Sequence, residues 1–213
     1  MKIAVVDYGM GNLRSVTKAL EHVAGDLANI VLTADPAIVA AADKVVFPGQ
    51  GAMPDCMKEL TERGLKQAVL DAAQNKPFLG ICVGAQLLFE SSEEGHTPGL
   101  GIFKGKVVRF PKEKMLDAQG QKLKVPHMGW NEMFKVQDHP LWAGIPDGER
   151  FYFVHSYHFQ PSENIAVLES AYPYRFAAAV ARDNIFAIQC HPEKSHHAGL
   201  SLLKNFVNWN GNT

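Results

Sequence analysis

Short apolar runs alternate with helical patterns in the first half of the chain. The first helical pattern follows Asn12, which stands at the capping position before apolar residues spaced three or four apart. Strand alternating with helix predicts a parallel sheet covered on both faces. The expected strands are 3–6, 29–32, 44–47 and 77–82, and the expected helices are 13–23, 65–73 and one that carries Leu87, Leu88 and Phe89.

The second half is richer in strands than in helices. Asp183 and Asn184 separate two apolar runs as a two-residue hairpin loop, in which asparagine tolerates the positive φ that such turns need. The expected strands are 106–110, 151–154, 165–169, 176–182 and 185–190, with a closing helix over 195–209. Because no repeat or linker interrupts the chain, we expect one domain over residues 1–213, an α/β fold with an open, mainly parallel sheet, helices on both faces and added antiparallel strands.

Composition narrows the class of protein. The chain has 213 residues, 46% of them hydrophobic, and a formal net charge of −1. This balance predicts a substantial core and no affinity for nucleic acid or an anionic membrane. No apolar run approaches the about 18 residues of a membrane span, and the initial run is too short for a signal peptide. Three cysteines without CxxC spacing favour a reducing, cytoplasmic setting.

Cys82 is the most informative residue for chemistry. An apolar strand leads into it, glycines stand two positions to either side, and a helical pattern follows. This arrangement is typical of a nucleophile elbow, in which small neighbours let the chain turn sharply. A thiol at a helix N-terminus also faces the positive end of the helix dipole, which favours the thiolate. A structural buried cysteine is the alternative.

His191 is the candidate base for that thiol. It follows the run 185–190, and Pro192 biases it toward an extended backbone, so the imidazole can project from the end of a strand. Glu193 lies two positions on and can hydrogen-bond the ring, as the third member of a catalytic triad does. Both Cys82 and His191 stand at carboxyl ends of expected strands, where sites gather in parallel α/β sheets.

An oxyanion hole is predicted beside the thiol. Gln50 lies between two glycines after the run 44–47, so its backbone N–H is free to be presented. The N–H of Val83, the residue after the nucleophile, is the expected second donor. An ordinary glycine-rich turn between strand and helix fits the Gln50 segment equally well.

Two other motifs do not indicate a cofactor. Gly9 and Gly11 lack the third glycine of a dinucleotide loop, because Arg14 occupies its place. His196 and His197 are adjacent and point in different directions on a helix, so they do not form a metal site with His191. We therefore expect neither cofactor nor metal.

Taken together, the motifs resemble those of class I glutamine amidotransferases. The nucleophile segment Gly80-Ile81-Cys82-Val83-Gly84 and the segment His191-Pro192-Glu193 carry this resemblance. Further segments are similar to the glutaminase subunits of imidazole glycerol phosphate synthases, and the similarity spans nearly the whole chain. These segments are 7–16, 126–131, 153–157 and 191–195.

The resemblance implies a flavodoxin-like sheet and a specific reaction. Cys82 would attack the side-chain amide of glutamine and form a thioester, His191 would move the proton, and Glu193 would orient His191. The residues implied to bind glutamine are Gly51, Gln86, Glu94, with its carboxylate at the substrate ammonium, and Ser156 and Tyr157, with backbone groups at the substrate carboxylate. The ammonia would pass to a separate cyclase subunit, which is a (β/α)8 barrel that makes imidazole glycerol phosphate and an aminoimidazole carboxamide ribotide.

Four residues are candidates for the face that meets the cyclase: Asn12, Trp130, Asn131 and Lys194. The alternative is that Trp130 belongs to the core and Lys194 is a solvated charge. For the activity, the alternatives are a cysteine peptidase on the same fold, a non-catalytic scaffold, or the glutaminase of anthranilate, guanylate or pyridoxal phosphate synthesis.

Overall fold

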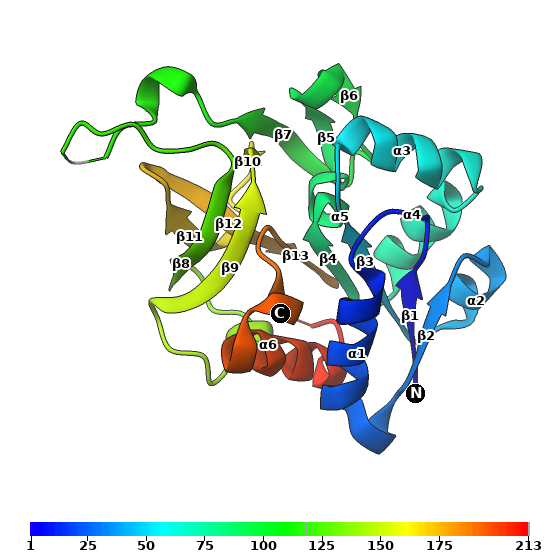
Figure 1. Ribbon diagram of the computed structural model, residues 1–213. Helices are drawn as coiled ribbons and strands as arrows, with labels where there is room; N and C mark the ends of the chain where they lie inside the picture. The colour runs from blue at the N-terminus through cyan, green and yellow to red at the C-terminus, as the bar shows by residue number, and fades with distance from the viewer. Residues whose placement is uncertain (118, 213) are drawn as a thin grey trace.

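The computed structural model describes residues 1–117 and 119–212 and shows an α/β protein built on one large sheet (Figure 1). The strands are β1 (Lys2–Val6), β2 (Asn29–Thr33), β3 (Lys44–Gly49), β4 (Phe78–Cys82), β5 (Phe89–Ser92), β6 (Thr97–Pro98), β7 (Phe103–Arg109), β8 (His127–Lys135), β9 (Glu149–His155), β10 (Tyr157–Pro161), β11 (Ala166–Ala171), β12 (Arg175–Arg182) and β13 (Ile185–Ile188). The helices are α1 (Leu13–Ala24), α2 (Pro36–Ala41), α3 (Met53–Glu62), α4 (Lys66–Asn75), α5 (Val83–Gln86) and α6 (His196–Asn208).

The sheet has a parallel half and an antiparallel half. The order β2-β1-β3-β4-β13 is parallel throughout, and β12, β10 and β7 continue it with antiparallel pairing. The strands β11, β8 and β9 form a branch from β12. The α/β class with added antiparallel strands is therefore confirmed.

Helices cover both faces of the parallel half. Figure 1 shows α1 and α6 side by side, and these two helices contact each other. Helices α2 and α4 contact each other as well. Right-handed crossovers place α1 on one face of the sheet and α2 and α4, which precede β3 and β4, on the other. The pair α1 and α6 therefore lies on the face opposite to the pair α2 and α4. The carboxyl ends of β3, β4 and β13 remain open between them.

Several elements differ from the sequence-based expectation. The helix after Cys82 ends at Gln86, and Phe89 instead begins strand β5, where it is buried against Phe103 and Phe159. The apolar run 87–89 has no helical period, so its pairing with β7 decided the outcome. Helices α2 and α3 and strands β8 and β10 were not predicted.

Two turns also differ in detail. The hairpin between β12 and β13 forms as expected, but Asp183 adopts the positive φ of 53°, while the Asn184 side chain donates to the carbonyls of Ala73 and Lys76. Asn12 stands at the N-cap of α1, yet its side chain makes no capping hydrogen bond.

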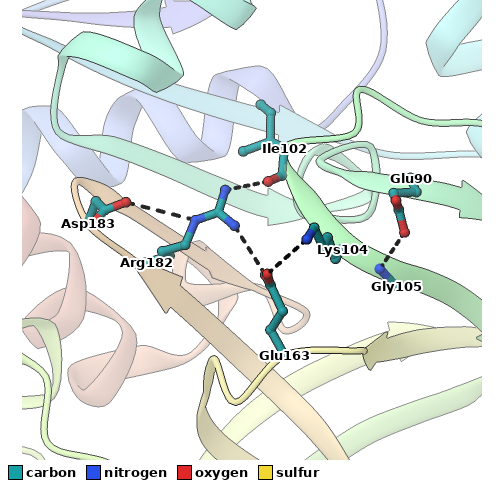
Figure 2. Close-up of polar contacts among 7 residues, drawn as sticks. All are labelled: Glu90, Ile102, Lys104, Gly105, Glu163, Arg182 and Asp183. Carbon is teal, nitrogen blue, oxygen red and sulfur yellow. Dashed lines mark hydrogen bonds and ion pairs between the residues drawn. The ribbon is translucent and has the colours of Figure 1, made fainter.

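An ion-pair cluster ties the far end of β12 to the start of β7. Figure 2 shows the Arg182 guanidinium donating to the Ile102 carbonyl and pairing with Glu163. The Arg182 and Glu163 side chains are 3.1 Å apart. Glu163 also lies 4.0 Å from Lys104, and Asp183 lies 3.9 Å from Arg182. This cluster fastens the antiparallel strands at the edge of the sheet opposite the open carboxyl ends of β4 and β13.

Candidate active site

Cys82 lies at a strained turn between β4 and α5. Its backbone has φ 54° and ψ −116°, a conformation that side-chain-bearing residues rarely adopt. The side chain is only 4% exposed, at the carboxyl end of β4. A strained strand-to-helix turn that presents a thiol is the geometry of a nucleophile elbow.

The glycines around Cys82 allow close backbone contact. A Cβ on Gly84 would stand 2.0 Å from the Phe47 carbonyl oxygen of β3, and one on Gly49 would stand 2.5 Å from the Gly84 nitrogen. A Cβ on Gly80 would meet Ala85 at 3.0 Å. The end of β3 and the first turn of α5 therefore touch through backbone atoms alone, which brings the Gln50 loop beside Cys82.

His191 and Glu193 form a buried pair next to the elbow. His191 follows β13, which is parallel to β4, and its Nδ1 lies 2.9 Å from Oε1 of Glu193. The two side chains are 5% and 1% exposed. Because a carboxylate only accepts, Nδ1 carries a proton and Nε2 is left for the Cys82 side of the ring.

The charge state of His191 follows from its neighbours. Burial lowers the pKa of His191, but the charge and hydrogen bond of Cys82, together with the Glu193 carboxylate, outweigh it and raise this pKa to about 10. The His191 ring is therefore protonated on both nitrogens, as an imidazolium, at neutral pH. A thiolate facing an imidazolium is the reactive form of a cysteine nucleophile.

A pocket of about 320 Å³ opens at Cys82 and His191. Its size suits a small metabolite. The predicted site residues that line it are Gln50, Gly51, Cys82, Val83, Gln86, Glu94, Ser156, Tyr157, His191 and Lys194. Glu193 stands behind His191, while Asn12, Trp130 and Asn131 do not line the pocket.

Side chains on the pocket wall are held by internal hydrogen bonds. Gln86 donates to the Tyr157 carbonyl at 3.2 Å and to Gln189 at 3.0 Å. Glu94 accepts from the backbone N–H of Met53 at 2.9 Å, which anchors its carboxylate at the start of α3. The wall is therefore ordered before a ligand binds.

The Gln50 loop is anchored from the side of α3. The Cys56 thiol donates to the Gln50 carbonyl at 3.4 Å, and burial raises the pKa of Cys56 to about 11, so the thiol keeps its proton. The peptide that follows Gln50 thus has its carbonyl directed toward α3. The use of the Gln50 and Val83 N–H groups as an oxyanion hole stays a prediction.

Two residues of this region were missed by the sequence analysis. Gln189 is fully buried, and its Nε2 lies 4.0 Å from the Cys82 sulfur. His155 lines the pocket and bonds to the Tyr157 carbonyl. Gln189 lies two positions before His191, which was the one available signal. His155 reaches the site because it ends β9, which pairs with β8 and leads directly into β10.

The candidate partner residues have mixed surroundings. Trp130 is 41% exposed and stacks on His196 at 4.9 Å, so it does not belong to the core. Lys194 lies at the pocket, in a short turn that packs against α1, the helix that follows Asn12. The Asn131 amide bonds within the chain, to His127 and to the Ala171 carbonyl. A role in partner binding stays a prediction for all four.

The remaining cysteine and histidine residues show no metal cluster. Among the described residues, no group of three or more His, Cys, Asp or Glu side chains is arranged to hold a metal ion. Cys190 is fully buried, and burial raises its pKa well above the usual range. Cys190 therefore packs in the core.

Comparison with known proteins decides the family. The model of the family "Glutamine amidotransferase class-I" matches residues 4–209. The chain belongs to the class I glutamine amidotransferase family. It is therefore an amidotransferase with the motifs of that family at its carboxyl-end pocket.

Relatives within the family are similar over their full length. A protein of Chromobacterium violaceum, "Imidazole glycerol phosphate synthase subunit HisH", is 63% identical and covers 100% of both chains. A protein of the same description from Dechloromonas aromatica is 64% identical over 97% of this chain and 96% of its own.

A solved structure supports the fold. The crystal structure of a putative GMP synthase component from Thermoplasma acidophilum has a TM-score of 0.70 and 21% identity, and the match covers 98% of this amidotransferase and 92% of that chain. No helix among the described residues is long and apolar enough to cross a membrane.

Proposed function

We propose that this amidotransferase is the glutaminase subunit of imidazole glycerol phosphate synthase in histidine biosynthesis. It hydrolyses glutamine to glutamate and ammonia and passes the ammonia to a cyclase subunit. The observation that carries the proposal is the strained Cys82 elbow beside His191 in one small pocket, with Glu193 bonded to His191 from behind. The full-length similarity to HisH subunits supports the choice of synthase.

In the first half of the reaction, the Cys82 thiolate attacks the side-chain carbonyl carbon of glutamine. The oxyanion is stabilised by the N–H groups of Gln50 and Val83. The carbon–nitrogen bond then breaks, and His191, which already holds a proton, delivers it from Nε2 to the departing nitrogen. Ammonia leaves, and a thioester with Cys82 remains.

In the second half, water attacks the thioester. His191, now neutral, takes a proton from the water, and Glu193 stabilises the imidazolium that forms again. The carbon–sulfur bond breaks, glutamate leaves and the thiolate returns. Gly51, Gln86, Glu94, Ser156 and Tyr157 hold the substrate in this scheme.

The proposal includes the partner and the setting. The cyclase subunit is a (β/α)8 barrel that docks on the face of Asn12, Trp130, Asn131 and Lys194. Three free cysteines support a reducing, cytoplasmic compartment. One core that includes buried residues from Ile3 to Trp209 supports a single domain over the chain.

Substitution of Cys82 by alanine in the complex with the cyclase tests the proposal. We expect glutamine-dependent synthesis of imidazole glycerol phosphate to disappear, while synthesis from added ammonia survives, because only the nucleophile is lost. The ammonia-dependent rate is the internal control for folding and docking. Continued turnover with glutamine, or release of peptides in place of ammonia by the unmodified chain, contradicts the proposal.

A further inference from the structure

Two buried histidines outside the triad form a hydrogen-bonded line toward the pocket. His127 of β8 and His155 of β9 are 3% and 5% exposed, and Nδ1 of His127 lies 2.9 Å from Nε2 of His155. Nδ1 of His155 lies 2.8 Å from the carbonyl oxygen of Tyr157. At the other end, the Asn131 amide nitrogen lies 3.2 Å from Nε2 of His127.

The direction of every bond in this line follows from the Tyr157 carbonyl. A carbonyl only accepts, so His155 must carry its proton on Nδ1. Neutral His155 then accepts at Nε2, and His127 must donate from its own Nδ1. His127 in turn accepts at Nε2 from Asn131, whose amide orientation is set by the Glu132 N–H at its oxygen.

Aromatic packing keeps both rings in place and uncharged. His127 stacks on Tyr172 at 4.0 Å and on Phe153 at 5.0 Å, and His155 lies against Phe110 and Phe176. Burial lowers the pKa of His127 to about 4 and that of His155 well below its usual range. The titratable groups that face His155 are His127, His158 and His191, and no carboxylate bonds either ring in the described residues.

The line ends on an atom that the pocket also uses. The Tyr157 carbonyl accepts from His155 and from Gln86, so both of its lone pairs are engaged. Gln86 donates onward to Gln189, whose amide faces the Cys82 sulfur. The orientation of the Tyr157 peptide thereby sets the orientation of two amides beside the nucleophile.

We propose that His127 and His155 are positioning residues, which hold the Tyr157 peptide and the Gln86 amide in the geometry that binds substrate. The expected effect on KM for glutamine rests on the proposed function, whereas the hydrogen-bond directions of the two histidines do not. His155 reaches the wall of the pocket, but among the described residues neither histidine hydrogen-bonds Cys82 or His191, and both act through the shared Tyr157 carbonyl.

Nitrogen-15 NMR of the isolated chain tests the structural part. Spectra of His127→Phe and His155→Phe variants assign the two rings. We expect both to be Nδ1–H tautomers at pH 7, whereas free histidine prefers Nε2–H, and neither to titrate above pH 5. An Nε2–H tautomer at either ring, or titration near pH 6.5, overturns the proposal.

Glutaminase kinetics in the cyclase complex test the functional part. His155→Phe keeps an aromatic ring but removes both the donor to the Tyr157 carbonyl and the acceptor for His127. We expect KM for glutamine to rise about tenfold, with a smaller change in kcat, because the Tyr157 carbonyl loses one of its two buried hydrogen bonds. His155→Asn places an amide N–H where Nδ1 was, and should bring KM back to within about threefold of the unmodified complex.

His158 supplies the matched control. It is equally buried, its Nδ1 lies 3.0 Å from the Phe159 carbonyl, and it packs on the same Phe110 and Phe176 rings, but that carbonyl bonds no group of the pocket. His158→Phe should leave KM unchanged. Equal KM values for the Phe and Asn variants at position 155, or equal effects at 155 and 158, overturn the proposal. If the unmodified complex fails to hydrolyse glutamine, the proposed function fails instead, and the NMR result still decides whether the His127–His155 hydrogen bonds have the proposed directions.

Discussion

The strain at Cys82 can be measured by comparing alanine with glycine at that position. With φ 54° and ψ −116°, any residue with a Cβ is strained there by roughly 1–3 kcal/mol, and glycine is not. Cys82→Ala keeps the Cβ and therefore the strain, and Cys82→Gly removes both. Because both variants lack the thiol, their difference in stability reports the backbone and not the chemistry.

The expected magnitude follows from two opposing effects. At an ordinary position, replacing alanine by glycine costs about 1 kcal/mol, through chain entropy and lost packing. Relief of about 2 kcal/mol of strain at position 82 exceeds this cost. We therefore expect Cys82→Gly to be about 1 kcal/mol more stable than Cys82→Ala, which corresponds to about 3 °C in Tm for a chain of this size.

Urea unfolding of the isolated chain is the assay, and Ala68 in α4 is the control position. Ala68→Gly should lower the free energy of unfolding by about 1 kcal/mol, because this helix has ordinary backbone geometry. The two alanine-to-glycine comparisons should thus differ by about 2 kcal/mol. If replacing alanine by glycine lowers the free energy of unfolding as much at position 82 as at position 68, the turn at Cys82 is not strained and the argument for a nucleophile elbow fails.

Three further outcomes are expected. Gly84→Ala should destabilise the fold by about 3 kcal/mol and abolish glutaminase activity, because its Cβ would lie 2.0 Å from the Phe47 carbonyl; a near-neutral change in urea unfolding contradicts this. Burial lowers the pKa of His127 and His139 to about 4, so the unfolded chain binds more protons than the folded chain between pH 6.5 and 4. As the pH falls through this range, the free energy of unfolding should fall by about 1.4 kcal/mol per pH unit for each of the two histidines, which urea midpoints measured against pH will show. Cys82→Ser should lower the pKa of His191 from about 10, because only Glu193 then raises this pKa against the lowering effect of burial. An unchanged NMR titration of His191 refutes the thiolate–imidazolium pair.

The candidate triad could be proposed from local sequence because its members lie at or just after strand ends. A strand that runs into Cys82 between two glycines is a local pattern, and so is His191 two positions before Glu193. The expected parallel sheet placed both segments at one edge, and β4 and β13 are indeed neighbours in the sheet. Backbone sterics and strand direction are sufficient for this part of the site.

The elements between these motifs were harder to predict because their partners are distant in the sequence. Strand β8 alternates poorly between buried and exposed residues, and its neighbours are β9 and β11. The segment 89–92 becomes strand β5 because β6 and β7 pair with it. Apolar character alone does not distinguish a short strand from a helix when the pairing partner decides.

The amino-acid sequence by itself determined the α/β class and pointed to Cys82 and His191 as the candidate nucleophile and base, because periodicity, glycine spacing and strand ends act over a few residues. Only the tertiary structure decided which side chains surround them. The His127–His155 contact, the Gln189 amide beside Cys82 and the exposed Trp130 all depend on contacts between strands or segments far apart in the chain. Such contacts follow from how the whole sheet assembles, since each hydrogen bond needs both of its partners in place.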